Sequence, residues 1–295
     1  IIVAKDKNER FIGQFQRIPC KYYIDGELFD AYWGMDYIVE EASRGSAAGV
    51  FLAKQALKDN HFGMGLSPIS FKLHILLGEK HISDYYKYIR FKSLPDLLKF
   101  ALSIIIKHPL LSRNTSDYYP NIINIGSVCF QKKSNPSDIN WEFENNNYIE
   151  FSRDKEFLSW RFGSYPKIFT TYTYGDESGT KAYFIIRNVI WKGLPFLLLV
   201  DYKYRGDTLQ PLLKAVSKIL KKSHNYGIVT LSSFSDVDRA LKHNRYIKFG
   251  SSGQIVTNIR INLSKQQIKQ RKSIFVTFAD SDGDFFYGNK EWYEL

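Results

Sequence analysis

The chain has little cysteine and no long apolar run. Its 295 residues include two cysteines, Cys20 and Cys129, which excludes a disulfide scaffold or a cysteine-rich zinc module and suits a reducing compartment. The longest apolar stretches, 100–106 and 196–200, are far shorter than the roughly 20 residues of a membrane-spanning helix. We therefore expect a cytoplasmic protein without stable membrane insertion. The chain opens in a strand-like segment without a signal-peptide pattern, so we also expect that an N-terminal piece is missing.

The chain has fewer acidic than basic residues, and most of this difference lies in its second half. The chain carries 41 basic and 30 acidic side chains, and the net charge is +1 over residues 1–150 but +10 over 151–295. A positive half suits a polyanion, namely nucleic acid, an anionic membrane surface or a phosphorylated small molecule. A basic, solvated surface without a specific ligand is the alternative. Because the sequence has no zinc-finger spacing, RNA-binding aromatic signature or sustained basic amphipathic helix, we expect no nucleic-acid partner.

The first part of the chain alternates strand-like and helix-like patterns. With 44% hydrophobic and 16% aromatic residues, the chain can bury a sizeable core, and its length allows two domains. Asp25-Gly26 is a strong hairpin-turn signal. We expect strands at 1–5, 11–17, 21–24, 28–39 and 62–66, and helices at 47–59, 69–77 and 94–107.

The second half repeats this order of elements after a polar connection. We expect one strand within the connection, at 122–131. After the connection we expect strands at 168–174, 182–187, 195–202, 227–231 and 273–278, and helices at 209–222 and 235–243. Strands, a long helix, a strand and a short helix thus occur twice, which indicates two related units. We expect an N-terminal domain at 1–112, a connection at 113–147 and a C-terminal domain at 148–295. The expected fold class is α/β (mixed α+β).

The most informative motif is a small-residue loop between a strand and a helix. It comprises Arg44, Gly45, Ser46, Ala47, Ala48, Gly49 and Val50. Small side chains let the backbone approach a ligand, and free N–H groups at a helix start favour phosphate oxygens. The spacing fits neither the P-loop nor the dinucleotide fingerprint. A tight turn with ordinary small-residue packing is the alternative.

This motif resembles the acyl-CoA pyrophosphate loop of the GNAT acyltransferase superfamily. Arg44, Ala47 and Gly49 fill the three positions of its Arg-x-x-Gly/Ala-x-Gly signature, and Val39 precedes the arginine by five residues. The resemblance implies two tandem GNAT-like units, each a mixed, mostly antiparallel sheet flanked by helices. It implies that Arg44 to Val50 bind the pyrophosphate of an acyl-CoA co-substrate. The backbone of Ile38 and Val39 would then pair with the pantetheine amides.

The second unit resembles a degenerate copy of the first. Asp201-Tyr202 is similar to Asp36-Tyr37, but larger residues replace the small ones of the loop, so we expect no second cofactor site. Tandem units with a Leu-x-Trp-Arg motif at 158–161 resemble bacterial two-domain sugar N-acyltransferases of the anthrose-biosynthesis type. The resemblance implies transfer of an acyl group to a nucleotide-linked amino sugar in cell-surface polysaccharide biosynthesis.

The resemblance implies direct attack of an amine on the thioester, with the Val39 N–H stabilising the oxyanion. Asp36 is the candidate base, and a capping or ion-pairing aspartate is the alternative. His74 stands where many family members carry a tyrosine that protonates the leaving thiolate, and a histidine with an ordinary pKa near neutrality suits that role. A structural histidine is the alternative for His74.

The acceptor is expected to be a small-molecule amine that binds Trp160, Arg161 and Asp201. The alternatives for these residues are a core aromatic, a salt-bridge partner and a structural strand aspartate. We expect no metal. The competing functions are an aminoacyl-tRNA-dependent peptidyl transferase of the Fem type and a non-enzymatic module that binds polyanions through the basic second half.

Overall fold

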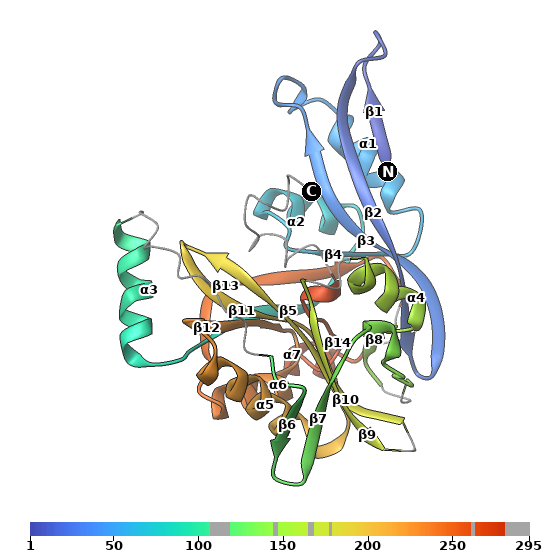
Figure 1. The fold of residues 1–295 in the computed structure, drawn as a ribbon. Helices are drawn as coiled ribbons and strands as arrows, with labels where there is room; N and C mark the ends of the chain where they lie inside the picture. The colour runs from blue at the N-terminus through green and yellow to red at the C-terminus, as the bar shows by residue number, and fades with distance from the viewer. Residues whose placement is uncertain (107–118, 144–146, 165–167, 177–178, 261–262, 281–295) are drawn as a thin grey trace. The chain divides into compact units, whose positions relative to one another are not determined.

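The computed structural model describes residues 1–106, 119–143, 147–164, 168–176, 179–260 and 263–280 (Figure 1). The chain forms two compact units. Unit 1 comprises 1–85, 144–152 and 251–275, and unit 2 comprises 86–143, 153–250 and 276–295. None of the described helices is long and apolar enough to cross a membrane.

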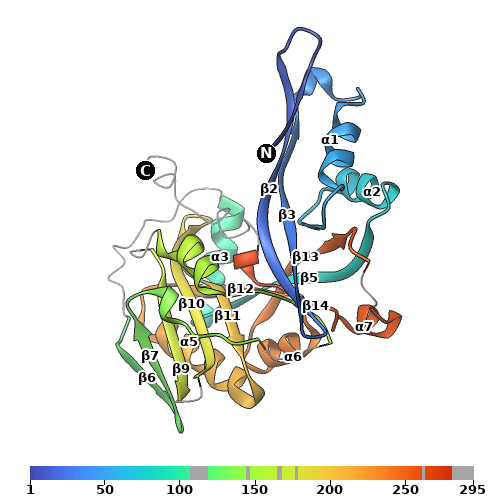
Figure 2. The ribbon, with the colours of Figure 1, turned by 90° about the vertical axis from the view of Figure 1, so that its right-hand side faces the viewer.

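Unit 1 contains a mixed sheet with helices beside a long hairpin. Its strands follow the order β14-β8-β2-β3-β4-β13, and β1 pairs with the outer part of β2. Figure 2 shows α1 and α2 on the same side of the β2–β3 hairpin. The elements are β1 (Ile2–Lys5), β2 (Phe11–Ile24), β3 (Glu27–Val39), α1 (Ala48–Ala56), β4 (His61–Met64), α2 (Pro68–Leu76), the start of β5 (Lys80–Phe91), β8 (Ile149–Phe151), the end of β13 (Ile247–Thr257), α7 (Lys265–Gln270) and β14 (Ile274–Phe275).

The strands of unit 2 include parallel and antiparallel pairs and follow the order β5-β12-β11-β10-β9-β7-β6. The β11 strand is almost entirely buried, the middle of β10 is buried, and α5 buries an apolar face of leucine, valine and isoleucine. The elements are the end of β5, α3 (Leu94–Ile106), β6 (Ile122–Ile125), β7 (Val128–Lys133), α4 (Lys155–Leu158), β9 (Thr170–Asp176), β10 (Gly179–Trp191), β11 (Leu194–Tyr204), α5 (Leu209–Lys222), β12 (Gly227–Ser232), α6 (Ser235–His243) and the start of β13.

In each unit, one parallel strand pair meets over only two residues. In unit 1, β3 and β4 pair at Tyr32↔His61 and Trp33↔Phe62, whereas β3 continues to Val39. In unit 2, β11 and β12 are paired at 197↔228 and 198↔229, whereas β11 continues to 204. Each unit therefore has a strand whose far half lacks a parallel neighbour within the described residues.

The α/β (mixed α+β) class and the helices near 47–59, 69–77, 94–107, 209–222 and 235–243 are confirmed. The hairpin turn is also confirmed, because Asp25 and Gly26 both have positive φ angles, 50° and 84°. Both central residues of a type I′ turn need this conformation.

Several predicted strands differ from the structure. The two strands predicted at 11–17 and 21–24 form one strand, β2, which runs through Pro19. Proline is tolerated there because β1 pairs with β2 only as far as Phe15, and β8 pairs only from Tyr22, so no ladder needs the missing N–H. The predicted strand at 122–131 is a hairpin, β6–β7, which turns at Gly126 with φ +60°. Of the predicted strand at 273–278, only β14 is formed.

The units also divide the chain differently from the predicted domains at 1–112 and 148–295. The β5 and β13 strands were missed, and each begins in one unit and ends in the other. Part of the predicted connection, at 113–118 and 144–146, lies outside the described residues.

Candidate functional site

The bend between β3 and α1 presents several free backbone amides. A short 3₁₀ turn at Glu41–Ser43 leads into it, and α1 begins after the N-cap residue Ala47. The Ala48 amide bonds to Ser46 Oγ at 3.2 Å. Within the described residues, four other amides of the bend have no hydrogen-bond acceptor: those of Gly45, Ala47, Gly49 and Val50. Free N–H groups at a helix N-terminus form a site for an anion.

Two glycines and one arginine help to determine the shape of the bend. Gly45 has φ +94°, a left-handed conformation that favours glycine. Gly49 has no room for a side chain, since an added Cβ would lie 2.7 Å from the Tyr37 hydroxyl. Arg44 is exposed, and its Nε donates to the Val39 carbonyl at 3.2 Å. The remaining guanidinium donors of Arg44 are thus available to a ligand at the bend.

The end of β3 offers an open strand edge next to this bend. The Glu40 amide donates to the Ile12 carbonyl at 2.9 Å, so the neighbouring Val39 directs its N–H and C=O away from β2. On that side β4 has already diverged from β3. A ligand with amide groups can add to such an edge as a further strand does.

Asp36 lies at a bulge in β3. The register with β2 shifts between Gln14 and Gln16, and Asp36 itself has φ +41°. A bulge re-aims the side chains around it. Asp36 is exposed, and its role as a base stays a prediction.

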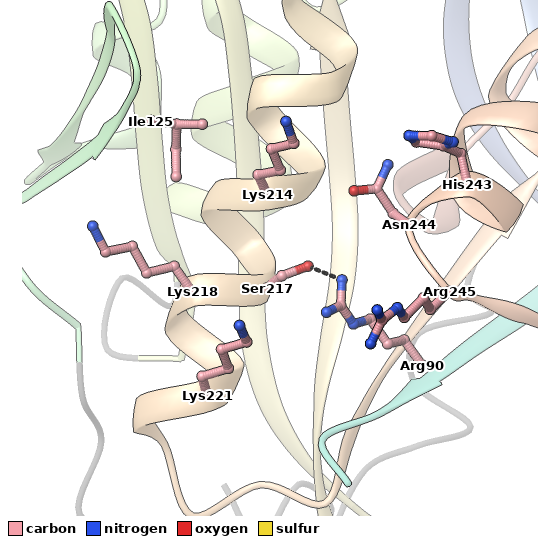
Figure 3. A pocket seen from close by; sticks show the side chains of 9 residues that line it. All are labelled: Arg90, Ile125, Lys214, Ser217, Lys218, Lys221, His243, Asn244 and Arg245. Carbon is pink, nitrogen blue, oxygen red and sulfur yellow. Dashed lines mark hydrogen bonds between the residues drawn. The ribbon is translucent and has the colours of Figure 1, made fainter.

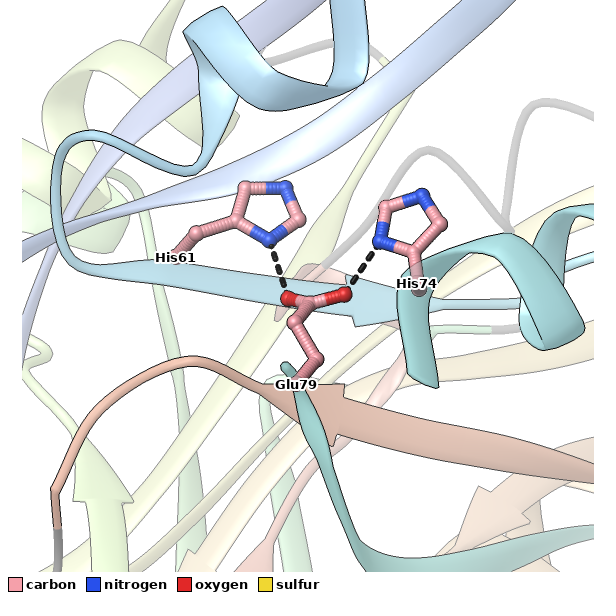
Figure 4. A group of neighbouring side chains, drawn as sticks. All are labelled: His61, His74 and Glu79. Atoms are coloured by element: carbon pink, nitrogen blue, oxygen red, sulfur yellow. Dashed lines mark hydrogen bonds and ion pairs between the residues drawn. The ribbon is translucent and has the colours of Figure 1, made fainter. Parts of the chain in front are cut away.

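A buried cluster of His61, His74 and Glu79 lies near the divergence of β3 and β4 (Figure 4). His61 begins β4, His74 lies in the last turn of α2, and Glu79 precedes β5. His61 Nδ1 lies 2.8 Å from Glu79 Oε1, and His74 Nδ1 bonds to the other carboxylate oxygen, Oε2. One carboxylate thus bridges two imidazole rings.

The hydrogen bonds to Glu79 determine which nitrogen of each imidazole ring carries a proton. Burial alone raises the pKa of Glu79, but the hydrogen bonds and charges of His61 and His74 outweigh it and hold that pKa below its ordinary value of 4.5. An ionised carboxylate only accepts hydrogen bonds, so both Nδ1 atoms carry protons. Both Nε2 atoms are buried and have no hydrogen-bond partner in the described part of the chain. A neutral ring then offers its Nε2 lone pair as a proton acceptor.

The three ligand-type atoms of this cluster lie within 4.8 Å of one another, a spacing that suits a metal ion. However, a histidine bound to a metal usually donates its second ring N–H to an acceptor. If the two Nδ1 atoms and the Glu79 carboxylate held an ion, Nε2 would be the second nitrogen of each ring, and neither Nε2 has an acceptor among the described residues. The hydrogen-bonded arrangement therefore fits the cluster better than a metal site does, and the expected absence of metal stays a prediction.

Aromatic side chains and a glycine pack around the cluster. The Phe15 ring lies 5.6 Å from His61 and 6.3 Å from His74, between ring centroids. The Tyr37 ring meets His74 edge to face at 6.4 Å, and burial raises the pKa of Tyr37. A side chain at Gly34 would collide with the His61 ring. His74, Tyr37 and the bend at Gly49 thus form one connected region of unit 1.

The hydrogen bonds of Glu79 give the stability of the protein a pH dependence. Because the pKa of Glu79 is lower in the folded state, its contribution is complete above the unfolded pKa and is lost as the pH falls through the folded pKa. We expect the unfolding free energy, measured with urea between pH 6 and 3, to fall less steeply below about pH 4.5 in Glu79→Gln than in the native chain. The exposed Glu27→Gln variant is the control and should keep the native slope; an unchanged slope in Glu79→Gln would contradict the assignment.

The three predicted acceptor residues lie in unit 2. Trp160 is 51% exposed and packs on Phe157 at 6.0 Å. Arg161 is buried, and its Nε donates to the Ala279 carbonyl at 3.4 Å. The exposed face of Trp160 leaves room for a ligand, and the acceptor roles of Trp160 and Arg161 stay predictions.

Asp201 is enclosed in a buried ion-pair network. It accepts hydrogen bonds from Arg153 at 2.9 and 3.1 Å, from Tyr183 Oη at 2.8 Å and from Thr277 Oγ1 at 2.7 Å. Burial raises the pKa of Asp201, and the Arg153 guanidinium more than offsets this, so the pKa is lowered. The network gives Asp201 a structural role, and its acceptor role stays a prediction.

Sequence reasoning found the bend, Asp36 and His74 but missed Glu79, His61, Tyr37 and Gly34. Glu79 directly follows Gly78, which ends α2 with φ +98°. Such a position does not mark an acidic residue as functional. The sequence therefore indicated the cluster only through the presence of two histidines within 20 residues.

No family model matches the sequence, and no curated protein matches it significantly. Solved structures do match. A GCN5-related N-acetyltransferase from Anabaena variabilis has a TM-score of 0.54 at 12% identity, over 86% of this chain and 61% of that one. A probable N-acyltransferase from Enterococcus faecalis has the same TM-score and identity, over 85% and 59%. N-myristoyltransferase of Saccharomyces cerevisiae, with bound myristoyl-CoA, has a TM-score of 0.52 at 12% identity, over 85% and 64%.

These likenesses identify the fold. The chain has the fold of the GCN5-related N-acetyltransferases (GNAT), which confirms the predicted architecture. It spans about three fifths of the length of these three solved structures.

Proposed function

We propose that the chain is an acyl-CoA-dependent N-acyltransferase that moves an acyl group directly from the thioester to an amine. The observation that carries the proposal is the open edge of β3 beside four free amides at the bend. An acyl-CoA has the matching parts, because its pantetheine arm carries amides and its diphosphate carries the anionic oxygens. The fold is shared with a myristoyltransferase solved with its acyl-CoA.

The proposed reaction needs no nucleophile from the protein. The amine nitrogen attacks the thioester carbon, the C–S bond breaks, and the nitrogen gives up a proton. The Val39 N–H, which points to the open edge, stabilises the oxyanion. Asp36, directly or through a water, accepts the proton of the amine. The His74 ring, which takes up a proton at Nε2 before the reaction, supplies that proton to the leaving thiolate.

For the acceptor, we propose an amino sugar, nucleotide-linked, used in cell-surface polysaccharide synthesis. The support is the net charge of +10 over residues 151–295, which suits a diphosphate group. The 51% exposed Trp160 offers a face for a sugar or base.

Direct binding tests the proposal. We expect coenzyme A to bind the full chain, measured by calorimetry in physiological salt, and acetyl-CoA and longer acyl-CoAs to be consumed when amino sugars are supplied. Coenzyme A that fails to bind would overturn the proposal. Binding of aminoacyl-tRNA together with no affinity for coenzyme A would favour the Fem-type reaction, and binding of anionic vesicles alone would favour a non-enzymatic module.

A further inference from the structure

Unit 2 contains a pocket of about 540 Å³, and the described residues of its walls include five cationic side chains and no acidic one. Figure 3 shows three lysines along α5, Lys214, Lys218 and Lys221, opposite the guanidinium groups of Arg90 and Arg245. The pocket residues come from β5, β6, α5, the end of α6 and the two residues that follow α6. All belong to one unit.

The lysines form a stripe on the solvent face of α5. Positions 214, 218 and 221 are spaced by four and three residues, which places them on one face of a helix. The opposite face is buried through residues such as Leu213, Val216 and Leu220. Like charges at this spacing destabilise a helix. Lys221 lies in the last turn of α5, where a cation is favourable, but the stability of the helix does not explain Lys214 and Lys218.

None of the five cations has a carboxylate partner in the described part of the chain. Arg90 donates to Ser217 Oγ, and its guanidinium lies 6.0 Å from the Tyr246 ring. Lys218 Nζ lies 3.3 Å from the Asn124 carbonyl. These contacts position two of the cations without neutralising them, so the positive charge of the pocket is left for a ligand.

Arg245 occupies a backbone position that normally holds glycine. It follows the C-cap residue of α6 with φ +63°. Its amide bonds to the Lys242 carbonyl and the Tyr246 amide to the Leu241 carbonyl, both at 3.0 Å, which is the Schellman pattern. A side chain there is strained, whereas glycine is not. The strained arginine carries its charge into the pocket.

We propose that this pocket binds the diphosphate group of a small molecule. Adjacent phosphates match several converging cations, and arginine binds phosphate oxygens through two parallel hydrogen bonds. The pocket is concave and of small-molecule size. Among the described residues no phenylalanine, tyrosine or tryptophan lines it, and His243 is its one ring, which disfavours single-stranded nucleic acid. The site does not depend on acyl transfer.

Calorimetry with pyrophosphate tests the proposal on the full chain. The Ala47→Glu background removes the bend of unit 1 as a competing anion site. We expect one saturable site, whose affinity falls at least 30-fold in Lys214→Glu/Lys221→Glu and stays within twofold in Lys242→Glu. Lys242 is exposed next to the pocket but does not line it. Absent binding, or equal effects of the two charge reversals, would overturn the proposal.

The Arg245→Gly variant separates binding from folding. We expect the melting temperature to rise by about 2 °C, since the strain is relieved, while pyrophosphate affinity falls about tenfold. An unchanged affinity would contradict the role of Arg245. If tRNA binds through the same lysines at least 100-fold more tightly than pyrophosphate does, the assignment to a small molecule is wrong.

Discussion

An Ala47→Glu variant is expected to raise the KM for acyl-CoA at least 100-fold without unfolding the protein. Ala47 is exposed and caps the N-terminus of α1. An acidic side chain at a helix N-terminus is favourable, so the melting temperature should stay the same or rise slightly. The same carboxylate faces the diphosphate. Two unit charges 4 Å apart repel by about 4 kcal/mol at an effective dielectric constant near 20, and about 2.8 kcal/mol suffices for 100-fold.

Two matched variants isolate the charge and its place. Ala47→Gln adds the same bulk without charge and should raise KM less than tenfold. Ala42→Glu adds the same charge at an exposed position of the preceding 3₁₀ turn and should have a smaller effect than Ala47→Glu. If Ala47→Glu keeps the native KM while the protein is active, the bend does not bind the diphosphate.

The sequence predicted the bend because its determinants are local. The turn at Asp25-Gly26, the small residues at 45–49 and the apolar spacing of 209–222 each define a backbone shape within one stretch of chain. Turn chemistry and helix periodicity act over a few residues, so a single sequence is enough to recognise them.

The sequence could not predict features that depend on distant partners. The β5 strand pairs with β12, about 140 residues later, and the β13 strand pairs with β4, about 190 residues earlier. The partner of Asp201 is Arg153, 48 residues away. The sequence led us to expect Asp201 in acceptor binding, but the similarity of Asp201-Tyr202 to Asp36-Tyr37 carries no information on which ion pair forms in the core.

The cluster of His61, His74 and Glu79 could not be predicted from the sequence either, because it depends on how separate elements pack together. Three short elements bring the residues together, and only the fold shows that one carboxylate serves two rings. The sequence pointed to His74 alone, whereas the structure places it in a hydrogen-bonded group. In this group Glu79 holds the His74 ring, which is expected to exchange the proton.

A Glu79→Gln variant is accordingly expected to lower kcat at least 100-fold with the KM for acyl-CoA within threefold. A carboxylate accepts hydrogen bonds from both Nδ1–H groups, whereas an amide accepts one and donates one. One ring must then move its proton to Nε2, where it no longer offers a lone pair. Proton transfer by a positioned side chain contributes about 10²- to 10⁴-fold to a rate, and His74→Asn should show a loss of the same size.

The pH profile of kcat distinguishes this role from simple destabilisation. If Glu79 positions a proton-transfer group, the profile of Glu79→Gln changes shape, whereas a destabilised protein would lose activity in parallel at every pH. His81→Asn is the matched control, because His81 also pairs with a carboxylate, Asp84, at 3.1 Å but is partly exposed. It should retain native kinetics. A tightly held metal ion in the purified chain, with activity lost on chelation, would instead assign the three residues to a metal site.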